Sequence, residues 1–359
     1  MRGIEAVETD SAVRCAERIS LRDTLTARCG RRSPGAGRAG SRIASPYSGA
    51  PLVAVGDTDP VPNNDVHPDL QRFARFAPRR LVGPRTLPLM RVALAWRGRL
   101  GKPVRDVQVI TLGSGVGVRL FRPAGAAETT PALLWIHGGG YVLGTAQQDD
   151  QLCSRFSRRL GITVASVDYR LAPEHPYPVP LEDCYTALTW LAGLPSVDRY
   201  RIAIGGASAG GGLAAALALL ARDRAEVSPA FQLLTYPMLD DRSSDTAPSP
   251  NYRLWDNRSN RFGWAAYLGA ADPHVAVPAR REDLSGLPPA WIGVGTHDLF
   301  HDEDLAYAER LRAAGVPCQV ETIPGAFHGF DLILPKVQVS QRFFDSQCNS
   351  LRAALTPAG

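Results

Sequence analysis

The sequence predicts an α/β fold in which a mostly parallel β-sheet is covered by helices on both faces. The first observation is a series of short, almost uninterrupted apolar runs, of which residues 131–137 are the clearest. Such runs are typical of strands buried on both faces of a sheet. The second is that helical patterns separate these runs, and the third is that 34 Gly and 29 Pro suit the many turns between them. Repeated strand–helix–strand units give parallel strands, because each helix returns the chain across the sheet.

The elements are expected in the following order. A first helix starts at His67, and a second covers residues 87–99 with an inward apolar face formed by Leu89, Met90, Ala93, Leu94 and Trp96. Apolar runs predict strands at 104–112, 116–121, 131–137, 162–167, 201–205, 230–234, 290–294 and 319–323. Helical patterns predict helices at 147–160, 180–192, 208–222, 302–314 and 337–354.

Two segments depart from this alternation. Residues 1–65 contain a Gly-, Ser- and Arg-rich stretch at 29–48 without apolar periodicity, so we expect a disordered N-terminal extension before one domain at 66–359. Residues 240–278 are rich in Ser, Pro, Asn and aromatic side chains. We expect this insertion to lie above the sheet as part of a lid.

Composition argues against several classes of protein. The net charge of +5 arises from 40 basic and 35 acidic residues, and the basic residues are scattered, so we expect no nucleic-acid partner. No apolar run approaches the ~18 residues of a membrane span. The six cysteines form no C-x-x-C pair, which argues against a zinc site or a disulfide framework. Reduced thiols in a cytoplasmic protein are the expected state.

Ser208 is the candidate nucleophile. It lies in the pentapeptide Gly206-Ala207-Ser208-Ala209-Gly210, which follows the apolar run at 201–205 and opens a long Ala- and Leu-rich helix. A serine on such a tight strand-to-helix turn needs small residues two positions away on either side. The N-terminus of the following helix adds partial positive charge where an anion would develop.

A glycine loop upstream supplies candidate donors for that anion. His137 is followed by Gly138, Gly139, Gly140 and Tyr141, directly after the strand predicted at 131–137. Three successive glycines let backbone N–H groups approach an oxyanion without interference from a Cβ atom. We therefore assign the oxyanion hole to the N–H groups of Gly139, Gly140 and Ala209, and we expect His137 to brace the loop by hydrogen bonding.

His328 and Asp298 are the candidate base and acid. His328 lies in a Gly-flanked loop after the last predicted strand, where the edge of a parallel sheet carries catalytic loops. Where a serine occupies such a turn, the acid lies between serine and histidine in the chain. Asp298 follows the strand at 290–294 and fits, whereas its competitor Asp302 begins the next helix, where acidic residues favour the N-terminus.

The spacing of His297 and His301 offers a weak alternative, because an i, i+4 histidine pair also occurs on metal-binding helices. No Glu follows the first histidine and no third ligand is placed nearby, so we expect no metal and no cofactor.

Taken together, these motifs resemble the hormone-sensitive-lipase-like group of bacterial carboxylesterases. The resemblance covers about residues 67–355 and rests on the HGGGY loop at 137–141, DYRLAPEHP at 168–176, GGASAGG at 205–211 and FHGF at 327–330. Two departures are that Ala207 stands where many relatives have Asp or Thr, and that the acid motif reads Asp298-Leu299-Phe300 instead of D-P-L. We expect Asp168 and Arg170 of the DYRLAPEHP stretch to pair and hold that loop.

The resemblance implies an α/β-hydrolase fold with a mostly parallel eight-stranded sheet and a helical lid built from about 66–103 and 240–278. It also implies a serine carboxylesterase that hydrolyses short- to medium-chain esters through an acyl-enzyme, with a small-molecule ester as its partner. The residues expected to bind substrate are Tyr141, Leu89, Met90 and Phe330, although Leu89 and Met90 also fit a role in sealing the lid onto the core.

Several alternatives stay open from the sequence. Amide or lactone hydrolysis and acyl transfer could use the same three residues, because the triad does not fix the leaving group. A different class of function is also possible, namely a non-catalytic ligand-binding protein on this scaffold. Such proteins usually lack one of the three residues. The oligomeric state is also open, with a homodimer as one option.

Overall fold

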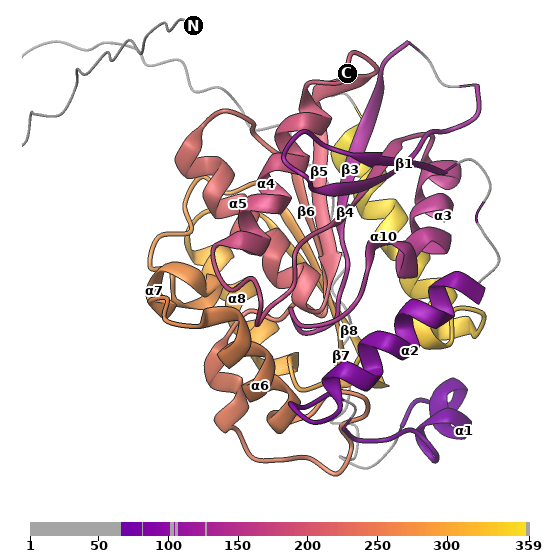
Figure 1. Ribbon diagram of the computed structural model, residues 1–359, viewed down its shortest axis with the longest axis vertical. Helices are drawn as coiled ribbons and strands as arrows, with labels where there is room; N and C mark the ends of the chain where they lie inside the picture. The colour runs from indigo at the N-terminus through magenta and orange to yellow at the C-terminus, as the bar shows by residue number, and fades with distance from the viewer. Residues whose placement is uncertain (1–65, 81, 101–103, 105–106, 126–127, 357–359) are drawn as a thin grey trace, which may run out of the picture. The chain divides into compact units, whose positions relative to one another are not determined.

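The computed structural model describes residues 66–80, 82–100, 104, 107–125 and 128–356. All of them belong to one compact unit, Ala54–Gly359. The extension expected to be disordered, residues 1–65, lies outside the described residues. In Figure 1 the sheet occupies the middle of this unit, with helices on either side of it.

The sheet has eight strands in the order β1-β2-β4-β3-β5-β6-β7-β8. The strands are β1 (Val107–Thr111), β2 (Gly117–Phe121), β3 (Thr130–Ile136), β4 (Thr163–Asp168), β5 (Val197–Ala207), β6 (Phe231–Thr235), β7 (Ala290–His297) and β8 (Cys318–Phe327). Only β2 runs antiparallel to its neighbours β1 and β4, and the pairs from β4 to β8 are parallel. The mostly parallel sheet expected from the apolar runs is therefore confirmed.

Helices cover both faces of the sheet and are divided between two apolar clusters. The longer helices are α2 (Leu87–Leu100), α3 (Asp150–Leu160), α4 (Val179–Ala192), α5 (Ala209–Arg224), α6 (Asn257–Leu268), α8 (His301–Ala313) and α10 (Gln338–Leu355). Short ones are η1 (Pro68–Leu70), α1 (Gln71–Ala74), η2 (Ala146–Asp149), η3 (Asp241–Asp245), α7 (Pro273–Ala276), η4 (Pro278–Arg280) and α9 (Phe330–Ile333). Buried side chains of α4, α5 and α8 join one cluster, and those of α3 and α10 join the other.

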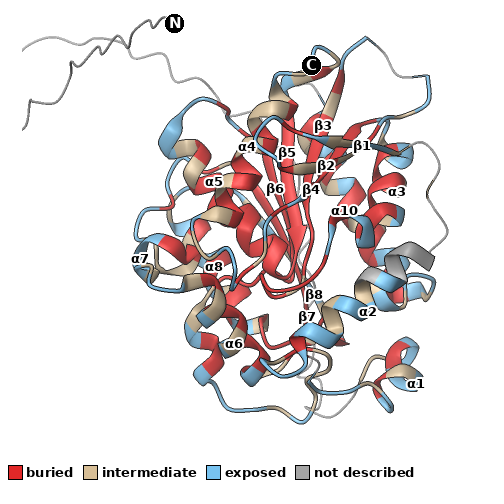
Figure 2. Cartoon of the chain, viewed as in Figure 1, coloured by how far each residue is buried: buried red, intermediate tan, exposed pale blue. Residues whose placement is uncertain are grey.

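The central strands are buried because helices cover both of their faces. Six of the seven residues of β3 are buried, and all five residues of β6 are buried. Figure 2 shows this buried layer running through the sheet and into α5. Each fully buried Leu, Ile or Val contributes about 1.5–3 kcal/mol relative to an exposed position, so these runs hold the sheet in its register.

The expected orientation of helix α2 is wrong for most of its apolar side chains. Leu89 and Trp96 are 73% and 58% exposed, and Ala93 is exposed as well, whereas Met90 and Leu94 pack partly against the core. Polar contacts of Arg91 orient the helix instead: its guanidinium donates to the carbonyl oxygens of Val142 and Ala172 and pairs with Glu174 at 2.7 Å. The helical pattern alone could not identify which face of α2 packs against the rest of the domain.

The expected pair between Asp168 and Arg170 is also wrong. Arg170 forms a bidentate pair with Asp183 of helix α4, in which Nη2 and Oδ1 lie 2.6 Å apart. Asp168 accepts a hydrogen bond from the backbone N–H of Ala146. Because Asp168 ends strand β4, its side chain faces the loop after β3, whereas Arg170 points toward α4.

A buried carboxyl on this framework gives a testable dependence of stability on pH. Burial raises the pKa of Asp149 to about 7, although the indole N–H of Trp135 donates to its Oδ2 over 2.8 Å. An unfolded aspartate titrates near pH ~3.9. Between these two values the folded chain retains a proton that the unfolded chain has released, so the free energy of unfolding falls as pH rises through this window.

We therefore expect Asp149→Asn to remove a destabilisation that grows by up to about 1.4 kcal/mol for each pH unit between about pH 4 and pH 7. Urea unfolding of the wild type and the variant at several pH values measures it. An equal pH slope in both proteins would show that Asp149 stays ionised in the folded chain.

Candidate active site

Ser208 occupies the turn between β5 and α5, and its backbone is in a conformation that few residues adopt. Its φ of 58° and ψ of −122° place it outside the regions that a serine usually occupies. The turn is tight because a Cβ atom on Gly206 or Gly210 would overlap the backbone around Ile136. Glycine at both positions thus lets β5 turn sharply into α5 and leaves the serine at the carboxyl edge of the sheet.

His328 and Asp298 meet Ser208 at this edge. The Nε2 atom of His328 lies 2.9 Å from Oγ of Ser208, and its Nδ1 atom lies 2.8 Å from Oδ2 of Asp298. A carboxylate only accepts hydrogen bonds, so Nδ1 carries the proton and Nε2 is free to accept one from the serine. The other carboxylate oxygen of Asp298 accepts from the N–H of Phe300 at 3.0 Å, which fixes the plane of the group.

The competing acid lies elsewhere. Asp302 is exposed, and its carboxylate lies 2.7 Å from Nδ1 of His301. The structure therefore brings Asp298, and not Asp302, to His328.

Two aromatic rings hold the imidazole of His328. The rings of Tyr236 and Phe300 contact it edge-on, at centroid distances of 4.9 and 5.1 Å. The Tyr236 hydroxyl donates to Oδ1 of Asp331 over 2.7 Å, and burial raises the pKa of this tyrosine well above its usual range. Neither ring was identified as part of the site from sequence, although Phe300 belongs to the Asp298-Leu299-Phe300 motif and Tyr236 directly follows strand β6.

The glycine loop lies beside the serine, because a Cβ atom on Gly138 would lie 3.3 Å from Cβ of Ser208. Gly139 and Gly140 have φ values of 131° and 61°, which a residue with a side chain adopts only at a cost. Among the hydrogen bonds of the described residues, none uses the N–H of Gly139, Gly140 or Ala209 as donor. These three N–H groups thus have no acceptor among the described residues, as the predicted oxyanion role requires.

His137 braces this loop, as expected. Its ring stacks on Tyr169 at a centroid distance of 4.3 Å, and its Nδ1 lies 2.8 Å from the carbonyl oxygen of Gly138. Burial lowers the pKa of His137 below its usual value. The ring is thus a neutral structural support and stands apart from the serine.

Two of the four residues expected to bind substrate are buried against other side chains. Tyr141 is buried, stacks on Tyr267 at 4.1 Å and donates its hydroxyl to the carbonyl oxygen of Met238, so it supports the loop from behind. Phe330 is fully buried against Phe343. Leu89 faces solvent on α2, and only Met90 has a partly buried side chain. The substrate contacts expected of these four residues therefore stay predictions.

The histidine pair considered as a metal site is divided between two elements. His297 ends strand β7 and His301 begins helix α8, so they do not share one helical face. Within the described part of the chain, no three His, Cys, Asp or Glu side chains gather closely enough to hold a metal ion.

None of the described helices combines the length and apolar character needed to cross a membrane.

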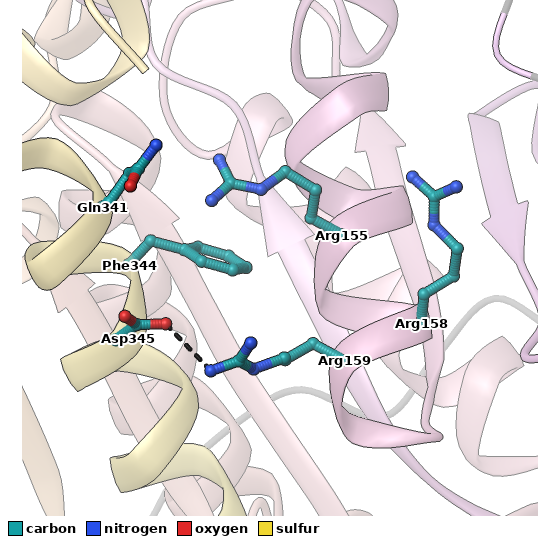
Figure 3. A pocket seen from close by; sticks show the side chains of 6 residues that line it. All are labelled: Arg155, Arg158, Arg159, Gln341, Phe344 and Asp345. Carbon is teal, nitrogen blue, oxygen red and sulfur yellow. Dashed lines mark hydrogen bonds and ion pairs between the residues drawn. The ribbon is translucent and has the colours of Figure 1, made fainter. Parts of the chain in front are cut away.

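An arginine-lined pocket lies between α3 and α10, apart from Ser208, His328 and Asp298 (Figure 3). Arg159 pairs with Asp345 at 3.1 Å, and the guanidinium carbon of Arg155 lies 3.8 Å from the centre of the Phe344 ring. Both contacts join α3 to α10, so we interpret these arginines as links between the two helices.

The oxyanion loop yields a prediction about activity. A Cβ atom on Gly139 would overlap the carbonyl oxygen of Leu143, and the φ of 131° disfavours alanine. We expect Gly139→Ala to displace an oxyanion donor and lower kcat for ester hydrolysis by about 10²–10³-fold.

Gly161→Ala is the matched control, because Gly161 also has a positive φ of 68° but has no atom within 4 Å of the added Cβ. Initial rates and thermal unfolding of both variants separate loss of catalysis from backbone strain. Equal activity of the two variants would contradict the assignment of Gly139.

The chain is similar to known proteins in both sequence and structure. The sequence profile of the alpha/beta hydrolase fold family matches residues 133–332. Esterase LipI of Mycobacterium tuberculosis is 37% identical over 238 residues, covering 63% of this chain and 74% of LipI. Carboxylesterase NlhH of the same organism is 34% identical over 308 residues, covering 79% of this chain and 93% of NlhH. The solved structure of a bacterial heroin esterase matches with a TM-score of 0.74 and 36% identity, over 81% of this chain and 98% of that chain.

Proposed function

Because the chain belongs to the alpha/beta hydrolase fold family and is a carboxylic ester hydrolase of the hormone-sensitive-lipase-like group, we propose that it cleaves short- to medium-chain esters through Ser208, His328 and Asp298. The observation that carries this proposal is the continuous hydrogen-bonded chain from Oγ of Ser208 through the imidazole of His328 to the Asp298 carboxylate.

The first half of the reaction forms an acyl-enzyme. Oγ of Ser208 attacks the ester carbonyl carbon while Nε2 of His328 takes the hydroxyl proton, which gives a tetrahedral oxyanion. The imidazolium then gives this proton to the leaving alkoxide, so an alcohol departs as the carbon–oxygen bond breaks. Asp298 stabilises the imidazolium and keeps the proton on Nδ1 in the resting enzyme.

Water completes the cycle by the same route. His328 takes a proton from the water as it attacks the acyl carbonyl, and returns the proton to Oγ of Ser208 when the carboxylic acid leaves. In both halves, the N–H groups of Gly139, Gly140 and Ala209 face the developing negative charge, and each donor is worth about 10²-fold or more in rate.

Residues 66–103 and 240–278 are proposed as the lid over this site. Contacts between the first and second segments support this assignment: Arg253 donates to the carbonyl oxygen of Ala74, and the N–H of Leu254 donates to that of Pro78. Arg80 also pairs with Asp256 at 2.9 Å. These contacts join the two segments, and α2 and α6 lie at the same end of the sheet in Figure 1.

Hydrolysis of p-nitrophenyl esters from acetate to palmitate tests the proposal. We expect turnover to be highest with the shorter chains, and a fluorophosphonate probe to label Ser208 stoichiometrically by mass spectrometry. Comparison with p-nitroanilides of the same acids tests the amide alternative. A folded protein that hydrolyses no ester and resists the probe would overturn the function.

A further inference from the structure

The indole ring of Trp255 lies directly on the oxyanion loop. A Cβ atom on Gly140 would overlap the six-membered ring of this indole, so the ring occupies the space that any other residue's side chain would need. Gly263 of α6 completes the contact, because a Cβ atom there would lie 2.8 Å from the Gly140 carbonyl oxygen and 3.4 Å from Cζ2 of Trp255. Helix α6, the indole and the loop are therefore packed together without intervening side chains.

Hydrogen bonds fix the ring in this place. Nε1 of Trp255 donates to Oδ1 of Asn260 over 3.2 Å, and Nδ2 of Asn260 donates to Oγ of Ser244 over 3.1 Å. All three residues are buried, and Trp255 exposes only 5% of its surface. The preceding residue, Leu254, has a φ of 69°, which turns the chain so that the indole points inward. The indole is held at its N–H by Asn260 and packs with its six-membered ring on Gly140, so it forms a rigid wall.

The position of this wall relative to His328 indicates which part of the substrate it meets. Its ring centroid lies 6.5 Å from that of His328, farther than the rings of Tyr236 and Phe300, and its direct contact is with Gly140. The leaving oxygen must lie at Nε2 of His328 to receive its proton. With the leaving oxygen at His328 and the oxyanion at the loop N–H groups, the acyl substituent takes the remaining direction, and Trp255 is the ring that borders both the loop and His328.

We propose that Trp255 is the specificity-determining residue that limits the acyl group of the substrate to a short chain. This inference rests on the proposed function. The low exposure of Ser208 and His328, 7% and 8%, agrees with a site that has little room beyond the reacting carbonyl. The chemical class that fits is an ester of a small carboxylic acid, and a longer acyl chain would need the space that the indole fills.

The test compares kcat/KM for p-nitrophenyl octanoate and acetate in the wild type, Trp255→Leu and Trp255→Phe. A change of one methylene in an apolar site alters kcat/KM by about 10-fold or more. We expect the octanoate-to-acetate ratio to rise at least tenfold in Trp255→Leu and by a smaller factor in Trp255→Phe, whose shorter ring frees part of the space. Asn260→Ala releases the indole N–H without removing the ring. It should raise the octanoate-to-acetate ratio by a factor between those of Trp255→Phe and Trp255→Leu.

Trp264→Leu is the matched control. This buried tryptophan also belongs to the insertion at 240–278, but its ring packs against Tyr141 and Tyr267, whereas the described rings next to His328 are those of Tyr236, Phe300 and Trp255. It should lose stability without a change in the ratio. Thermal unfolding confirms that each variant is folded, and Trp255→Phe carries the test if Trp255→Leu does not fold.

An unchanged ratio in the folded Trp255 variants, or a change confined to esters that vary in the alcohol, would overturn the inference. This failure is distinct from failure of the proposed function, because in the second case the wild type would neither hydrolyse any ester nor react with the fluorophosphonate probe.

Discussion

Replacing Ser208 with alanine is expected to lower kcat for p-nitrophenyl acetate by about 10⁶-fold. The variant keeps the helix N-terminus and the glycine loop, but it has no oxygen at 2.9 Å from Nε2 of His328 to attack the ester. A residual rate above that in water should remain, because the oxyanion donors and substrate binding still act. Burst kinetics of the wild type and steady-state rates of the variant measure the difference.

Ser166→Ala is the control for this substitution, because Ser166 is a fully buried serine in strand β4, away from the triad. It should retain nearly wild-type turnover. The affinity of Ser208→Ala for the substrate, measured by direct titration of the variant, should be almost the same as that of the wild type. Retention of more than about 1% of wild-type kcat in Ser208→Ala would assign the nucleophile to another residue.

The sequence was sufficient to predict the sheet and the order of the helices that flank it, and it singled out three residues that the structure brings together at the edge of the sheet. Apolar runs predict buried strands because the two faces of a parallel sheet leave no room for polar alternation, and β3 and β6 follow that pattern closely. The glycines around Ser208 are equally informative, since a turn that brings β5 so close to α5 excludes a Cβ atom at Gly206 and Gly210.

Contacts made between distant segments could not be predicted in the same way. The exposed face of α2 depends on where Arg91 finds its acceptors, and those belong to loops about 50 and 80 residues downstream. Trp255 is visible in the sequence only as one of several aromatic residues in the insertion. Its place on Gly140 follows from the left-handed turn at Leu254 and the bond to Asn260, neither of which has a distinctive pattern.

Tyr141 illustrates the same limit within a recognised motif. Its position next to three glycines suggests contact with substrate, but its positive φ of 66° turns the side chain behind the loop, against Tyr267. Proximity in sequence therefore could not indicate in which direction the Tyr141 side chain points.

The choice between Asp298 and Asp302 gives the second large effect. Asp298→Asn keeps the shape of the side chain but replaces an acceptor-only carboxylate with an amide that can present its NH₂ group to Nδ1 of His328. The imidazole would then adopt the other tautomer, with its proton on Nε2 facing Ser208, and could not accept the serine proton. We expect kcat near neutral pH to fall by about 10⁴-fold. The fold and the conformation of the oxyanion loop should be preserved.

Asp302→Asn provides a closely matched comparison, because the same substitution is made four residues later, at an exposed carboxylate that contacts His301. It should change kcat by less than about twofold, as is usual for a surface charge away from the site. The pH profile adds a second readout: in Asp298→Asn activity should recover at high pH, where hydroxide or a deprotonated serine no longer needs a general base. If Asp302→Asn were the more damaging change, the acid would have to be reassigned, and the 2.8 Å contact between Asp298 and His328 would be a structural hydrogen bond with no part in proton transfer.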